Sequence, residues 1–232
     1  MKKVIILSSV VLLGALVSCN CGVKNGNKNL KNETDSLSNA IGLMMGREIR
    51  SIDGIEVNNE VVYNAMQKVL SSSDKELDSL DRHQIREAQE YFRNYMMFVL
   101  PAKRLEAGQK FLEETAKKKG VQKTESGLYY EIIEEGDMNS KAFSDKDTVV
   151  VNYVGKTTDG KEFDSSFDRG EPAEFPLNMV IKGWTEGMQL VGKGGKIKLY
   201  IPSELGYGSR GQLGNQVLIF DVDLLDVKPA AE

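Results

Sequence analysis

Val151-Asn152-Tyr153-Val154-Gly155 is the first of four short segments that give this sequence its character. The others are Gly160-Lys161-Glu162-Phe163-Asp164-Ser165-Ser166, Val180-Ile181-Lys182-Gly183-Trp184 and Tyr207-Gly208. They combine two tyrosines, a phenylalanine, an aspartate and the only tryptophan of the chain, without the motif of a catalytic nucleophile, a metal site or a phosphate loop. We predict that they line one apolar slot, which would act through shape and solvation rather than through covalent chemistry.

The composition is that of an ordinary globular protein. The 232 residues are 41% hydrophobic and 28% charged, which is enough for one or two domains with real cores. The net charge of −4 argues against a nucleic-acid binder, which would carry a basic stripe. We expect no cofactor and no metal.

Residues 1–18 resemble the signal peptide of a lipoprotein. A basic start precedes an apolar run over residues 4–17, which is short for a membrane span. The run ends in Leu16-Val17-Ser18-Cys19, which resembles the lipobox of bacterial lipoproteins, where cleavage before the cysteine leaves it to be acylated. The alternative is an ordinary secretory signal followed by chance cysteines at 19 and 21. We favour the lipobox, because both cysteines sit at the cleavage point and none occurs elsewhere.

Residues 19–33 are rich in Asn, Gly and Lys and are predicted to form a flexible tether, whereas residues 34–119 follow a helical period. Asn58 is a candidate cap for the second helix, after a turn at Asp53-Gly54 and before a break at residues 71–73. The apolar positions of these two helices are Leu37, Ile41, Met44, Met45 and Ile49, then Val61, Val62, Ala65, Met66 and Val69.

A long helix should follow. Asp81 and Gln84 have the spacing of a capping box that would open it, and Pro101 should kink or split it. Its apolar stripe comprises Ile85, Ala88, Phe92, Tyr95, Met96, Val99, Ala102, Leu105, Phe111 and Leu112. Two short helices cannot cover a stripe of this length, so we predict a homodimer through the helical domain.

From Ser126 the apolar period changes from helical to alternating, and Asp159-Gly160 is a strong hairpin signal. The alternating faces are Leu128, Tyr130 and Ile132; Val149, Val151 and Tyr153; Ile197, Leu199 and Ile201; and Leu218, Phe220, Val222 and Leu224. Residues 184–191 are the one predicted helix in this half. Residues 120–232 should therefore form an antiparallel sheet around a short helix, which makes the chain α+β.

Residues 153–227 resemble the FKBP-type peptidyl-prolyl cis-trans isomerases through Phe-Asp-Ser-Ser, Gly-Trp and Tyr-Gly in that order. Gly108-Gln109-Lys110-Phe111-Leu112, Gly120-Val121 and Ser126-Gly127-Leu128 resemble the junction in the Mip-like and periplasmic subgroup, whose helical domain dimerises. The resemblance implies a prolyl isomerase that needs no acid, base or nucleophile.

The resemblance also implies roles for particular residues. Trp184 would be the floor under the proline ring, with walls from Tyr153, Phe163, Phe175, Val180, Ile181 and Phe220. The Ile181 N–H and the Tyr207 hydroxyl would donate to substrate carbonyls. Asp164 would lie near the twisted carbonyl, held by Tyr153 and Arg169.

Each of these residues also has a plainer interpretation. Val180, Phe175, Phe220 and Trp184 could be core residues, and Asp164 could be a turn residue beside two serines.

Two departures from the family stand out. The flap, residues 211–217, is short and lacks an Ile-Pro-Pro segment, so we interpret Leu213 as its apolar contact; Ala173 stands where some relatives carry an aromatic. Both open the slot and should weaken the binding of macrolide inhibitors.

Three functions remain open at this point. The first is a lipid-anchored isomerase with chaperone activity in a bacterial cell envelope, acting on proline-containing unfolded or exported proteins. The second is a non-enzymatic holdase chaperone, and the third a surface interaction lipoprotein on a borrowed fold.

Overall fold

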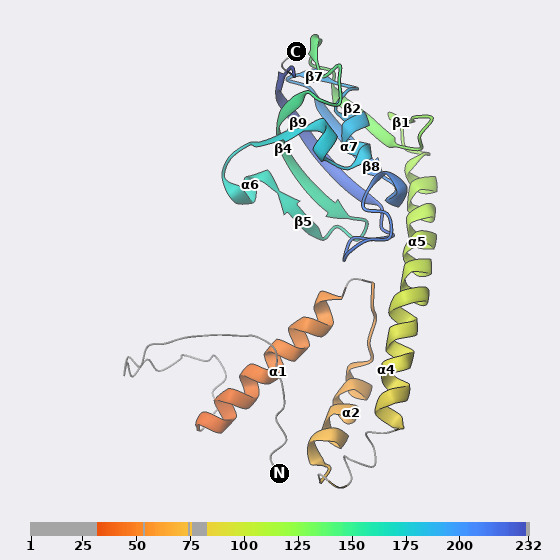
Figure 1. Cartoon of the computed structure of the whole chain (residues 1–232), viewed down its shortest axis with the longest axis vertical. Helices are drawn as coiled ribbons and strands as arrows, with labels where there is room; N and C mark the ends of the chain where they lie inside the picture. The colour runs from red at the N-terminus through yellow and green to blue at the C-terminus, as the bar shows by residue number, and fades with distance from the viewer. Residues whose placement is uncertain (1–31, 53, 74, 76–82, 231–232) are drawn as a thin grey trace. The chain divides into compact units, whose positions relative to one another are not determined.

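The structure, a computed structural model, describes residues 32–52, 54–73, 75 and 83–230 (Figure 1). The predicted signal peptide, the tether up to residue 31, Cys19 and Asp81 lie outside these ranges. The chain divides into two compact units, residues 1–51 and 52–232. None of the helices in the described ranges is both long and apolar enough to cross a bilayer.

Helix α1 (Glu33–Ser51) is the described part of the first unit and begins one residue before its predicted start. Helix α2 (Asn59–Ser71) opens the second unit. The predicted cap is confirmed, because Asn58 Oδ1 accepts from the N–H groups of Glu60 and Val61 at 3.0 and 3.2 Å. Capping satisfies backbone donors that the first helical turn leaves without partners.

The long helix is interrupted just before Pro101, as predicted. Helix α4 (Gln84–Asn94) passes into a π-helical turn, η1 (Tyr95–Val99), and then into α5 (Leu100–Thr115). The Leu100 N–H reaches back five residues to the Tyr95 carbonyl. Proline lacks an N–H and clashes with the carbonyl four residues before it, so the wider turn makes room for its ring without ending the helix.

The C-terminal half is built on one antiparallel sheet of seven strands, which confirms the α+β fold (Figure 1). In pairing order the strands are β1 (Val121–Lys123), β2 (Tyr129–Glu134), β8 (Lys196–Ile201), β9 (Leu218–Lys228), β4 (Thr148–Thr157) and β5 (Glu162–Ser165), with β6 (Ala173–Pro176) also paired to β4. A second small sheet joins β3 (Asp137–Lys141) and β7 (Gly192–Lys193). The predicted hairpin at Asp159-Gly160 joins β4 to β5, with Gly160 at a φ of +85°.

Helix α7 (Lys182–Gly187) packs on β8 at the centre of the core. Two glycines one helical turn apart allow its backbone to lie directly on the strand. A Cβ at Gly183 would lie 2.5 Å from Ile201 Cγ2, and a Cβ at Gly187 would lie 2.7 Å from Leu199 Cδ1. This close packing fixes Trp184, which lies between the two glycines.

The prediction of one helix over residues 184–191 was wrong in its bounds and its number. The helix begins at Lys182, because the Ile181 carbonyl already accepts from the N–H groups of Trp184 and Thr185, and it ends at Gly187. Met188 and Val191 lie three residues apart, as on one face of a helix, but they are buried in the turn that follows α7. Three single-turn helices were also missed: α6 (Ser166–Arg169), η2 (Leu177–Met179) and η3 (Ser203–Leu205).

Helix α5 covers part of the outer face of the sheet. Tyr200 alternates with core residues along β8, yet it is only 4% exposed, because the Phe111 ring of α5 lies 6.2 Å from it. The Lys118 ammonium sits about 5.4 Å and 5.5 Å from the Phe111 and Tyr200 ring centroids. The connecting helix is therefore part of the packing of the C-terminal half.

Candidate functional site

Trp184 lies at the centre of an aromatic cluster. Its ring meets those of Tyr153, Phe175 and Phe220 at centroid distances of 5.1, 5.7 and 5.2 Å. All three contacts are edge-to-face, with interplanar angles of 85°, 87° and 88°. In this arrangement the positive edge of one ring meets the negative face of another. Four different elements, α7, β4, β6 and β9, thus hold one indole in place.

Phe163 on β5 extends the aromatic cluster toward the surface. It meets Phe220 edge to face at 5.5 Å. Both rings cross the β4 backbone at Gly155, where a Cβ would lie 2.8 Å from Phe220 and 2.9 Å from Phe163. The contact between Phe163 and Phe220 therefore requires glycine at position 155, because any side chain there would collide with both rings.

Asp164 is held by Tyr153 and Arg169, the two residues that the family resemblance implied. One of its carboxylate oxygens accepts from the Tyr153 hydroxyl at 2.6 Å, and the other accepts from Arg169 Nη1 at 2.7 Å. Arg169 Nη2 also donates to the Tyr153 hydroxyl at 2.7 Å. The three side chains form a closed hydrogen-bonded ring beside the aromatic cluster.

The two serines after Asp164 explain how the chain brings Arg169 back to it. Ser165 caps α6 by accepting from the Phe167 N–H, and the helix ends one turn later at Gly170 in the left-handed region. The fully buried Ser166 Oγ accepts from the Tyr153 N–H at 2.9 Å. The Phe-Asp-Ser-Ser motif did not predict these supporting roles of the serines.

Val180 and Ile181 lie at the N-terminus of α7, half-buried against the core. The Ile181 carbonyl is used within the helix, but its N–H takes part in no hydrogen bond among the described residues. This donor is consistent with the predicted contact to a substrate carbonyl.

Tyr207 and Leu213 come from the loop that contains the flap. Together with Phe163 they border an open groove of about 460 Å³, whose other lining residues are Thr157, Lys161, Glu162, Arg210, Gly211 and Gln212. Tyr207 is 44% exposed, and Leu213 is half-buried against the core. The groove therefore brings Leu213 together with Phe163 and Tyr207, whereas Trp184 is not among its lining residues.

The charges of the site are fixed over a wide pH range. Partial burial alone would raise the pKa of the Asp164 carboxyl, but hydrogen bonds from Tyr153 and Arg169 outweigh it and hold the pKa below its usual 3.8. Burial, followed by the hydrogen bond to Asp164, raises the pKa of Tyr153. Burial and the charge of Asp164 raise the pKa of Tyr207. At neutral pH the site thus holds one carboxylate and two protonated hydroxyls.

The plainer interpretations are partly correct. Trp184 and Phe220 belong to the core cluster at 4% exposure each, and Phe175 and Val180 pack against it. Asp164 is more than a turn residue, since it closes the ring with Tyr153 and Arg169. Within the ranges that the structure describes, no three His, Cys, Asp or Glu side chains gather as a metal site.

Two family models match the chain. The domain amino terminal to FKBP-type peptidyl-prolyl isomerase matches residues 34–132, and the FKBP-type peptidyl-prolyl cis-trans isomerase matches residues 139–225. Among solved structures, the crystal structure of FkpA from Escherichia coli has a TM-score of 0.60 and 38% sequence identity, and the match covers 87% of this chain and 100% of that one.

Curated relatives agree with these matches. The FKBP-type peptidyl-prolyl cis-trans isomerase FkpA of Escherichia coli (strain K12) is 55% identical over 126 residues, which are 53% of this chain but 46% of that protein, so the match spans about half of its length. FkpA of Aeromonas hydrophila is 41% identical over 214 residues, covering 83% of this chain and 76% of the relative. The resemblance predicted from the four segments is confirmed, and the chain belongs to the family of FKBP-type peptidyl-prolyl cis-trans isomerases.

Proposed function

We propose that this protein accelerates cis-trans rotation about Xaa-Pro bonds in unfolded or exported proteins. The observation that carries the proposal is the ring of Asp164, Tyr153 and Arg169 beside Trp184, with its edge-on aromatic neighbours. It combines a tightly packed indole, 4% exposed, with a few fixed polar groups. Sites that bind small apolar groups with defined orientation have this composition.

The physical basis is preferential binding of the twisted amide. Rotation meets a barrier of roughly 18–20 kcal/mol because amide resonance is lost on the way, and Xaa-Pro bonds exchange over tens to hundreds of seconds without help. A twisted amide is less dipolar than a planar one, so transfer into an apolar slot costs it less. The slot thereby lowers the barrier without forming any covalent bond.

Each residue then has a defined task. The substrate proline would rest on Trp184, while the Ile181 N–H and the Tyr207 hydroxyl would donate to carbonyls of the substrate backbone. The carbonyl oxygen of a planar amide carries more negative charge than that of a twisted one. The nearby Asp164 carboxylate would therefore disfavour the planar state more than the twisted one.

The test is cis-to-trans exchange of an Xaa-Pro peptide, followed by NMR so that no coupled protease is needed. We expect the full chain to raise the exchange rate at catalytic concentrations. If exchange stays at the uncatalysed rate while the protein is folded, the proposed activity is wrong.

Adding a macrolide inhibitor should slow the catalysed exchange only weakly, because the short flap and Ala173 leave the slot open.

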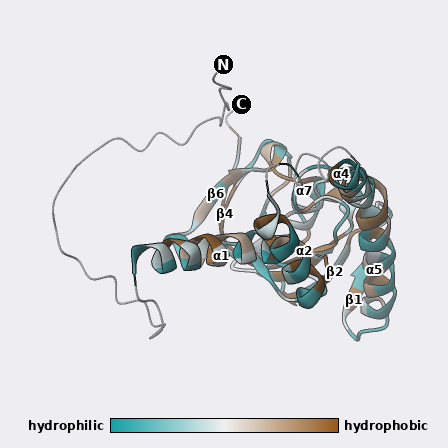
Figure 2. Cartoon of the chain, turned by 90° about the horizontal axis from the view of Figure 1, so that it is seen from below, coloured by the Kyte–Doolittle hydropathy of each residue, from teal (hydrophilic) through white to brown (hydrophobic). Residues whose placement is uncertain are grey.

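We also propose that two chains pair through the helical half, which would hold two slots over one client and support chaperone activity. Exposed apolar side chains on α1, α2 and the α4–η1–α5 helix support this. They include Leu37, Ile41, Leu43, Met44, Val61, Tyr63, Leu70, Tyr91, Phe92, Met97 and Phe98. In Figure 2, hydrophobic stretches drawn in brown alternate with hydrophilic ones along the ribbons of α1 and α2. Apolar surface on this scale usually marks an interaction site.

Phe98→Ser should weaken the dimer, because the ring is 66% exposed in the single chain and would be buried by the partner. Phe167→Ser is the matched control, since Phe167 is 60% exposed but belongs to the isomerase domain. In sedimentation velocity, we expect wild type and Phe167→Ser to run as dimers and Phe98→Ser to dissociate at micromolar concentration. A monomeric wild type would rule the pairing out. The same samples would test suppression of client aggregation, which should follow the dimer.

Finally, we propose that the protein is held in a bacterial cell envelope by lipid on Cys19. The support is the sequence of residues 1–19 alone. Several acyl chains would anchor it firmly, whereas one chain binds membranes only marginally. Labelling of the wild type with palmitate, absent from Cys19→Ala, is the expected result. An unlabelled wild type would contradict the anchor.

A further inference from the structure

The connecting helix α5 touches the flap (residues 211–217) directly. Arg104 Nη1 donates to the Gln212 carbonyl at 3.1 Å and to the Gly214 carbonyl at 3.2 Å. These two carbonyls stand on either side of Leu213, the flap residue that borders the groove with Phe163 and Tyr207. One side chain from the helical half thus holds the backbone around the apolar contact of the slot.

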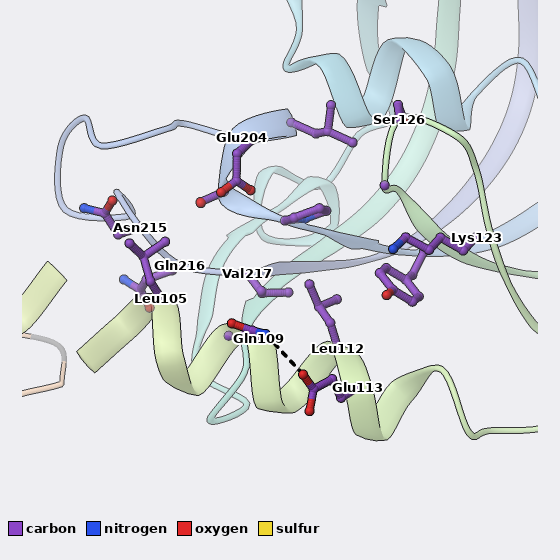
Figure 3. A pocket seen from close by; sticks show the side chains of 16 residues that line it. Leu105, Gln109, Leu112, Glu113, Lys123, Ser126, Glu204, Asn215, Gln216 and Val217 are labelled. Atoms are coloured by element: carbon purple, nitrogen blue, oxygen red, sulfur yellow. Dashed lines mark hydrogen bonds between the residues drawn. The ribbon is translucent and has the colours of Figure 1, made fainter. Parts of the chain in front are cut away.

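A second contact lies one turn further along α5. A Cβ at Gly108 would lie 2.9 Å from Val217 Cγ2, so the helix backbone rests on the last residue of the flap. Figure 3 shows the neighbouring groove, where Leu105 and Gln109 of α5 lie across from Gln216 and Val217. The flap is therefore supported by the helix at Gln212, Gly214 and Val217.

The flap has little of its own to fix its shape. Its sequence, Gly-Gln-Leu-Gly-Asn-Gln-Val, contains two glycines, which lose the most backbone entropy on ordering. Within the flap, the Gly214 N–H donates to the Gly211 carbonyl at 3.2 Å and Gln216 Nε2 donates to the Gln212 carbonyl at 3.1 Å. The Asn215 N–H donates to the carbonyl of Gly208, outside the flap, at 2.7 Å. Asn215 adopts a φ of +60°, a left-handed conformation that the surroundings must maintain. External support is what such a loop requires.

We propose that Arg104 is a positioning residue of the isomerase site, which acts through Leu213 although it belongs to the connecting helix. This inference rests on the proposed function. Its charge-assisted hydrogen bonds hold Leu213 against the groove before substrate arrives. The helical half then contributes to the isomerase site, because the α5 backbone packs directly against the flap.

The test compares full-length Arg104→Met, which keeps the length of the side chain but removes its donors, with Arg104→Lys and with Lys110→Met. Lys110 is an exposed cation on the same helix and serves as the control. Because the flap would contribute to substrate and transition state alike, we expect Arg104→Met to raise KM about fivefold with kcat nearly unchanged. Arg104→Lys should recover part of the loss, and Lys110→Met should match the wild type.

Two further readouts separate positioning from general destabilisation. Amide hydrogen exchange at Asn215 should quicken in Arg104→Met, while exchange at core amides such as that of Leu199 stays as in the wild type. Leu213→Ala should raise KM in the same way, and the double variant should be no worse than either single one, since both act at one contact.

The inference fails if Arg104→Met keeps the wild-type KM. It also fails if the increases in KM caused by Arg104→Met and Leu213→Ala add fully in the double variant, or if all core amides of Arg104→Met exchange faster than in the wild type. A wild type without isomerase activity would contradict the proposed function instead. In that case the comparison of Asn215 exchange would still decide whether Arg104 holds the flap.

Discussion

Trp184→Ala is expected to lower the free energy of unfolding by about 3–5 kcal/mol and to abolish isomerase activity. The indole is 4% exposed and meets three rings edge to face, so its removal leaves a cavity that four packed elements cannot close. Any fraction that still folds would lack the floor on which the substrate proline rests. Stability and activity should therefore fall together.

The measurement is urea unfolding followed by far-UV circular dichroism, because the variant has no tryptophan to follow by fluorescence. Trp184→Phe should lose less stability, since it keeps one ring in the cluster. Phe143→Ala is the control: it removes an aromatic side chain that is 69% exposed and should cost little. Equal stability of Trp184→Ala and wild type would show that the cluster does not support the fold.

Asp164→Ala is expected to reduce kcat/KM about ten- to a hundredfold with only a small loss of stability. The side chain is 43% exposed, and ion pairs at such positions contribute little to folding. Its charge, however, would act on the substrate carbonyl, and its loss leaves the Tyr153 hydroxyl and Arg169 to rearrange. We expect activity to fall while the fold persists.

Asp226→Ala is the matched control for this change. Asp226 pairs with Lys193 at 2.7 Å, the same distance as in the Asp164–Arg169 pair, and the two aspartate side chains are equally exposed at 43%. Peptide exchange and urea unfolding should be measured on both variants. If the two lose the same kcat/KM, the carboxylate of Asp164 has no special part in the reaction.

The pH dependence follows from the same ring of side chains. The pKa of Asp164 lies below 3.8 and those of Tyr153 and Tyr207 lie above 10, so kcat/KM should stay level between about pH 5 and pH 9. Because the carboxyl pKa is depressed by folding, its stabilising interactions are complete above the unfolded value of 3.8. They are lost only as the pH falls through the lower folded value.

Periodicity predicted most of the sheet. Val149, Val151 and Tyr153 on β4 and Leu218 to Leu224 on β9 are buried at alternate positions, because one face of each strand meets the core. The strands β1, β3, β6 and β7 were not predicted, since segments of two to five residues are too short to establish an alternating pattern. The helix near Trp184 was misplaced because burial of Met188 and Val191 in a turn imitates helical spacing.

The site residues were predicted through family resemblance, and both nearby and distant segments of the chain bring them together. Tyr153, Asp164 and Arg169 lie within 16 positions in the chain, so a hairpin and one helical turn bring them together. Arg104 was not predicted, because the carbonyls it binds lie 108 and 110 positions further on. Backbone acceptors carry no side-chain signature, so no pattern in the sequence indicates such a contact.

The π-helical turn before Pro101 also sets the phase of the connecting helix. An α-helix advances about 100° per residue, so the extra residue in η1 rotates everything before it by about that angle relative to α5. Leu100 is buried, and the residues in phase with it across the turn are Tyr95 and Met96, both half-buried, whereas Met97 is 59% exposed. The helix thus keeps Tyr95, Met96 and Leu100 on a covered side and leaves Met97 and Phe98 exposed. Loss of a single residue from Tyr95–Val99 would rotate α4 back and aim its apolar residues in a new direction.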